Sequence, residues 1–176
     1  MNELEPLLGR WANFYLITSA AAATLIGLLF VVITLAAERR VADAAKIPIY
    51  LTPTIVYYAS VLGVAVLLTF PNHTRLTATL CICLMGVVGS VYSGSFFIGR
   101  GVKKSHYERR DLIPYAVFPF AAYGLVVLGG VLLLHDPQRG LTLVAAGMLS
   151  LLAVAIRNSW AIAVEVVSTR PGQKGP

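Results

Sequence analysis

The chain has 176 residues and a formal net charge of +6 at pH 7. Of its residues 57% are hydrophobic and only 12% are charged, and the mean hydropathy is +0.77. Soluble domains carry roughly 25% charged residues, so the composition excludes an ordinary soluble protein and indicates an integral membrane protein.

Five segments are long enough and apolar enough to cross a bilayer. A hydrocarbon core of ~30 Å needs ~20 helical residues at ~1.5 Å each. In chain order the predicted spans run from about Trp11 to Ala37, Leu51 to Phe70, Leu76 to Ile98, Leu112 to Leu134 and Leu141 to Val167. We therefore predict an all-α fold, a polytopic transmembrane bundle that occupies residues 1–176 as one domain. Residues 168–176 are expected to form a short flexible cytoplasmic tail.

Basic residues are distributed unevenly between the two sides of this predicted bundle. Ten lie in the first and third connections and in the tail, whereas Arg10, Arg75 and Arg139 lie on the other side. Because Lys and Arg in short loops are retained in the cytoplasm, the N-terminus is predicted outside and the C-terminus inside.

Small residues recur at helical spacing in four of the predicted spans. Such rows let helix backbones approach closely in a membrane. The candidate helix-contact residues are Ser19, Ala23 and Gly27 in the first span, Gly86, Ser90 and Gly94 in the third, and Gly147 and Ser150 in the fifth, and Ala59 and Gly63 form a shorter row in the second. Packing within one bundle explains each row taken alone. The rows of the first three spans in so small a chain also favour self-association or a membrane-protein partner.

The third connection holds a cluster of basic residues close to the membrane. Its members are Arg100, Lys103, Lys104, Arg109 and Arg110. Such clusters attract anionic lipid headgroups by ~1 kcal/mol per residue, so a contact with anionic lipid is one hypothesis and a purely topological role is the other. Nucleic acid is not expected as a partner, because the cluster is short and no binding module surrounds it.

The fifth span contains the one basic residue within a predicted span, Arg157, which is followed by Asn158 and, three residues on, by Trp160. Arg157 lies about 24 Å from Leu141 along a helix, close to the inner interface. One interpretation is that Arg157 extends to the headgroups beside an interfacial tryptophan. The other is a buried polar network of Arg157, Asn158 and Glu165.

Catalytic and metal-binding patterns are not found in the sequence. His73, His106 and His135 fall in three different loops, and Cys81 and Cys83 would point about 160° apart on a helix. No nucleophile elbow, phosphate loop, zinc-protease motif or dinucleotide fingerprint is present. We therefore expect no enzyme activity, no cofactor and no metal.

Two passages, FYLITSAAAATLIGLLFVVITL and IRNSW, carry a family resemblance. They resemble a loose group of small bacterial inner-membrane proteins of unassigned function, which have an alanine-rich first span with G-L-x-F-V and R-N-x-W in the last span. The matching residues are Phe14, Tyr15, Ala21 to Ala23, Gly27, Leu28, Phe30, Val31, Arg157, Asn158 and Trp160. The resemblance implies a multi-pass protein of the inner (plasma) membrane and supplies no catalytic residue.

The function expected from these observations is association within the membrane, as an accessory subunit, assembly partner or regulator. The expected partners are the lipid bilayer and either a second copy of the chain or another membrane protein. An oligomeric channel or transporter for a small solute, possibly an anion, is the alternative, with Arg157 lining its inner mouth.

Overall fold

The computed structural model describes residues 4–38, 47–71, 74–96 and 109–168, with side chains over 4–35, 51–71, 74–95 and 117–164. Every regular element in these ranges is an α-helix, which confirms the predicted all-α class. The helices are α1 (Leu4–Glu38), α2 (Ile47–Thr69), α3 (Arg75–Phe96), α4 (Arg109–Leu132) and α5 (Pro137–Ser168). Residues 169–176, which make up most of the predicted tail, lie outside the described residues.

Local capping explains where α3 and α5 begin. The Thr77 backbone N–H donates to Thr74 Oγ1 at 3.2 Å, and the Thr74 N–H donates to Thr77 Oγ1 at 2.9 Å, a reciprocal cap of the first turn of α3. Before α5, Asp136 Oδ1 accepts from the Arg139 N–H at 3.1 Å. Pro137 suits the first helical position, where no N–H is needed. The helix therefore begins ahead of Leu141, the start expected from hydropathy.

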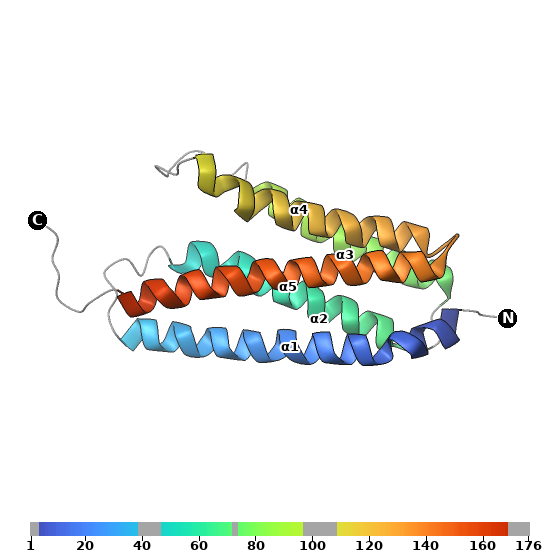
Figure 1. Ribbon diagram of the computed structural model, residues 1–176, viewed down its shortest axis with the longest axis horizontal. Helices are drawn as coiled ribbons and strands as arrows, with labels where there is room; N and C mark the ends of the chain where they lie inside the picture. Colours follow the sequence, from blue (N-terminus) through green and yellow to red (C-terminus); the bar gives the residue numbers. More distant parts are fainter. Residues whose placement is uncertain (1–3, 39–46, 72–73, 97–108, 169–176) are drawn as a thin grey trace, which may run out of the picture.

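The five helices are arranged around a central pair, α2 and α5 (Figure 1). α1 packs against both members of this pair on one side. α3 and α4 lie on the other side, where α3 contacts α2 and α4, and α4 contacts α5. We call the end with the start of α1 and the α2–α3 and α4–α5 turns the N-end. The opposite end, where α1 and α5 finish, is the C-end.

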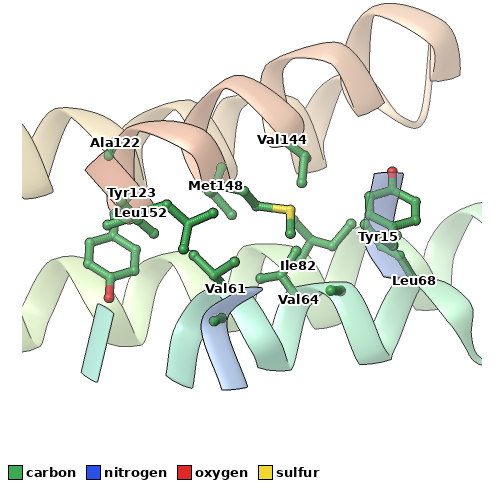
Figure 2. Close-up of a cluster of buried hydrophobic side chains, with 14 of the residues drawn as sticks. Tyr15, Val61, Val64, Leu68, Ile82, Ala122, Tyr123, Val144, Met148 and Leu152 are labelled. Carbon is green, nitrogen blue, oxygen red and sulfur yellow. The ribbon is translucent and has the colours of Figure 1, made fainter. Parts of the chain in front are cut away.

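Apolar side chains from all five helices meet in one continuous core (Figure 2). The fully enclosed large side chains include Tyr15, Tyr58, Ile82, Tyr123 and Met148, each less than 2% exposed. Figure 2 shows Met148 near the centre of the labelled side chains. The centre of the bundle is therefore built from apolar side chains of every helix.

Four helices are long and apolar enough to cross a membrane: α1, α2, α3 and α5. The described part of α4 contributes a shorter apolar stretch over Val117–Leu132. Many large apolar side chains point outward from these helices, among them Leu16, Leu80 and Trp160. An apolar outer surface over an equally apolar core is typical of a membrane protein, because lipid rather than water surrounds the bundle.

Candidate functional site: a buried polar cluster around α2

The middle of α2 carries three polar side chains that are all buried, Tyr57, Tyr58 and Ser60. Successive residues of a helix point about 100° apart, so Tyr57 and Tyr58 face different neighbours. Tyr57 contacts Tyr123 of α4, with the ring centroids 6.2 Å apart and the rings edge to face. Tyr58 instead reaches Ser159 of α5. Polar contacts therefore leave α2 on two sides.

The α4 side of α2 is held by a hydroxyl pair. Ser60 Oγ and Tyr123 Oη lie 2.8 Å apart, and Ser60 Oγ also donates to the Val56 carbonyl at 2.8 Å. A serine hydroxyl has one hydrogen, so Ser60 donates to its own helix and Tyr123 donates to Ser60. Gly89 of α3 makes this possible, because a Cβ there would overlap the Tyr123 ring.

The α5 side of α2 is held by a second hydroxyl pair. Tyr58 Oη and Ser159 Oγ lie 3.1 Å apart. Asn158, the residue before Ser159, is only 4% exposed, and its Oδ1 has no hydrogen-bond partner within the described part of the chain. Three further buried polar atoms of the described residues, Tyr15 Oη, Thr79 Oγ1 and Ser93 Oγ, also lack a hydrogen bond of good geometry, although Ser93 lies close enough to the Tyr57 hydroxyl to interact with it.

We call this group of side chains the polar cluster. Its members come from four helices and are Tyr57, Tyr58, Ser60, Ser93, Tyr123, Asn158 and Ser159. The cluster contains hydroxyls and one amide, which can exchange hydrogen bonds with one another. Among the described residues no group of three His, Cys, Asp or Glu side chains could hold a metal ion.

Two members of the predicted network of Arg157, Asn158 and Glu165 differ in burial. Asn158 is buried, whereas the neighbouring Arg157 is exposed on the outside of α5, as is Trp160, at 72%. Oδ1 of Asn158 accepts no hydrogen bond from Arg157. The Glu165 side chain lies outside the described residues, although its backbone is part of α5.

The predicted helix-contact residues fall into two groups. Gly86 and Gly147 are buried against α4. A Cβ at Gly86 would lie 2.6 Å from Val127 Cγ2, and one at Gly147 would lie 2.7 Å from Val126 Cγ2. By contrast, a Cβ at Gly94 would meet nothing within 4 Å. Ser90 and Ser150 are half-buried.

Two of the three members of the row on α1 point away from the rest of the described chain. Ala23 and Gly27 are exposed, and a Cβ at Gly27 would meet nothing within 4 Å. Ser19 is half-buried, and its hydroxyl donates to the Leu16 carbonyl of the same helix at 2.9 Å. The described chain therefore leaves this row without a contacting helix.

Several glycines that form close contacts were not singled out in the sequence. A Cβ at Gly129 would lie 2.7 Å from the Gly140 carbonyl oxygen, and one at Gly140 would lie 2.8 Å from the Gly129 carbonyl oxygen. A Cβ at Gly130 would likewise lie 2.8 Å from Cys83 Sγ of α3. The adjacent glycines at 129 and 130, with Gly140 seven residues before Gly147, were the available signal.

The tyrosines of the polar cluster were also missed by sequence reasoning. Tyrosines concentrate at membrane interfaces, whereas Tyr57, Tyr58 and Tyr123 lie well inside their helices. That position was the signal for a buried hydroxyl that needs a partner. The partners Ser60 and Ser159 could not be paired with them from sequence.

The predicted anionic-lipid contact falls largely outside the described structure. Arg100, Lys103 and Lys104 are outside the described residues. Arg109 and Arg110 form the first turn of α4, but their side chains are not described.

At the N-end, a shallow pocket of about 310 Å³ lies between the start of α1 and the α4–α5 turn, with Arg10 and Asp136 in its lining.

No family model, curated protein or solved structure matches this chain. The functional argument therefore rests on the fold and on the polar and small residues described above.

Proposed function

We propose that this chain is a small integral membrane protein that crosses a bacterial inner membrane five times and acts by association with another membrane chain. The partner is a second copy or a different subunit, for which this chain serves as an accessory or regulatory component. The bacterial inner membrane follows from the resemblance of the first and last spans to a group of such proteins. No catalytic role is included in the proposal.

The five-span topology is supported by the length of α4. This helix has 24 residues, and its part from Leu112 to Leu132, beyond the charged first turn, spans ~31 Å at ~1.5 Å per residue, enough for a ~30 Å hydrocarbon core. The excess of basic residues beside the C-end supports a cytoplasmic C-terminus. Alkaline phosphatase fused after residue 176 should be inactive, and a fluorescent protein fused there should fold. An active phosphatase would contradict the proposed orientation.

The observation that carries the proposal is the unused small-residue row on α1. Lipid tails fill space poorly against small side chains, and membrane helices associate where such rows face each other. The chain itself uses Gly86 and Gly147 for close contacts with α4, but leaves Ala23 and Gly27 open. A second helix can therefore approach α1 closely on this side.

A conducting role is less well supported by the geometry. The core between the described helices is built from buried apolar side chains such as Met148 and Ile82. Arg157, which a channel would need beside its pathway, is exposed on the outside of α5. Conduction would therefore require a path between subunits, and an ion-flux assay on the reconstituted protein tests that alternative directly.

Photo-crosslinking in the native membrane tests the association. A benzophenone amino acid at Ala23 should give a protein adduct, because this position faces the proposed partner. Leu80 of α3 is a matched control, since it is exposed at 67% but belongs to no small-residue row. We expect no protein adduct from Leu80. Adducts from neither position, or equally from both, would contradict association through α1.

A further inference from the structure

Asn158 is the starting point for an inference that is independent of the proposed association. Its side chain is 4% exposed, and its Oδ1 has no partner in the described chain. Buried polar atoms in folded proteins almost always have hydrogen-bond partners. Another subunit cannot supply one here, because the side chain is enclosed by its own chain.

The donors that could satisfy this oxygen are few. At this depth the backbone N–H groups of a helix are used within the helix itself, so a hydroxyl or a water molecule must donate. Ser159 follows Asn158 directly in α5, and its hydroxyl pairs with that of Tyr58. Each hydroxyl carries one hydrogen, and the hydrogen bond between Tyr58 and Ser159 uses only one of these two hydrogens. One hydrogen of this pair therefore remains to be donated.

We propose that a water molecule is bound inside the bundle beside Asn158. It accepts the remaining hydrogen of the Tyr58–Ser159 pair and donates to Asn158 Oδ1. Buried waters typically bridge two to four otherwise unsatisfied polar groups in this way. The water links α2 to α5 through the polar cluster and completes the hydrogen bonding of the amide.

Apolar side chains separate this site from the C-end. One turn beyond Asn158, Ile162 is buried against Leu29 of α1, with Leu51 and Ile55 of α2 packed around them. Towards the N-end, Ala155 and Leu151 of α5 are buried in the main core. The water is therefore an isolated structural ligand and does not belong to an open aqueous path.

Radiolytic hydroxyl labelling with mass spectrometry tests this site in the purified full-length protein. Radiolysis of a bound water releases hydroxyl radicals beside it, so a buried side chain next to such a water is oxidised. Tyr58 and Tyr123 are an internally matched pair: each is at most 1% exposed and bonded to a serine, but the Ser60–Tyr123 pair has no hydrogen left for a water, since Ser60 donates to the Val56 carbonyl. We expect Tyr58 to be oxidised several-fold faster than Tyr123. Equal rates in the wild-type protein would overturn the proposal.

The variant Asn158→Leu provides a second measurement. It should reduce the oxidation of Tyr58 to the rate of Tyr123 and lower the melting temperature, because the bridging water loses an acceptor. If the amide oxygen is instead unsatisfied and dry, the same variant removes a buried penalty and raises the melting temperature. A higher melting temperature would therefore overturn the proposal. If Asn158→Leu does not fold, the comparison of the two tyrosines in the wild-type protein still decides.

Discussion

Half of the most apolar window of α5 is buried inside the bundle, whereas the buried share of the corresponding window of α1 is 17%. α5 meets α4 through glycines, with Gly129 and Gly140 so close that neither position has room for a Cβ. α1 meets the bundle through larger side chains such as Tyr15 and Leu29, and its Gly27 faces outward. Close approach of the backbones therefore holds α5 against α4, whereas contacts between larger side chains hold α1 against the bundle.

This difference shows how stability is distributed in a bundle without a hydrophobic driving force between helices. Lipid tails are as apolar as leucine, so association depends on packing and on hydrogen bonds between helices. The α2–α5 and α3–α4 side of the chain has both, through its glycine contacts and the polar cluster. α1 has fewer of either, and its open row is available to a partner.

The largest expected effect comes from adding one methyl group where α4 meets α5. Gly129→Ala places its Cβ against the Gly140 carbonyl and Val144, and should lower the free energy of unfolding by about 1–3 kcal/mol through overpacking. Gly27→Ala is the control on α1. It has open space and gains helix propensity of up to ~1 kcal/mol. Reversible unfolding in detergent measures both, and equal losses would mean that α1 packs as tightly as α5.

The hydroxyl pair between α2 and α4 should contribute a smaller amount. Ser60→Ala, Tyr123→Phe and the double variant form a cycle whose coupling free energy we expect at about 0.5–1.5 kcal/mol. Ser19→Ala serves as the control on α1, because the Ser19 hydroxyl bonds only its own helix. A coupling free energy near zero would show that the 2.8 Å contact between Ser60 and Tyr123 adds no stability.

Arg157 should tolerate substitution better than Gly129 or the Ser60–Tyr123 pair. Its side chain is exposed, so Arg157→Leu and Arg157→Lys are expected to change the free energy of unfolding by no more than ~0.5 kcal/mol. The buried network considered from the sequence predicts otherwise: a large loss for leucine that lysine only partly restores. If thermal unfolding shows that second pattern, the Arg157 side chain takes part in a buried polar network.

Gly94→Leu is expected to have the smallest effect, since a Cβ at this position meets nothing within 4 Å. The oligomer mass from light scattering should match the wild type, and the melting temperature should not fall, because leucine also has the higher helix propensity. The reason is that Gly86 of the same row is buried against α4 of its own chain, whereas Ala23 and Gly27 on α1 face outward. A smaller oligomer mass would place α3, rather than α1, between copies.

Part of the candidate site was accessible from sequence. Asn158 was singled out because an amide in an apolar span needs a partner, and the structure buries it. Its pairing with Arg157 and Glu165 was inferred from spacing along one helix. Spacing along one helix carries no information about Tyr58 or Ser159 meeting across two helices, a contact between residues 101 positions apart.

The all-α class and the five helices could be predicted from the sequence. Inside a membrane each helix must close its own backbone hydrogen bonds, so hydropathy locates these elements without knowledge of the rest of the chain, whereas the caps at Thr74 and Asp136, seen in the structure, set the starts of α3 and α5. Which helix faces meet could not be predicted and is set by tertiary packing. In a soluble helix the polar face marks the outside, but here both faces are apolar. The rows at Ser19–Gly27 and Gly86–Gly94 therefore look alike in sequence, although just one of them has a glycine buried against another helix.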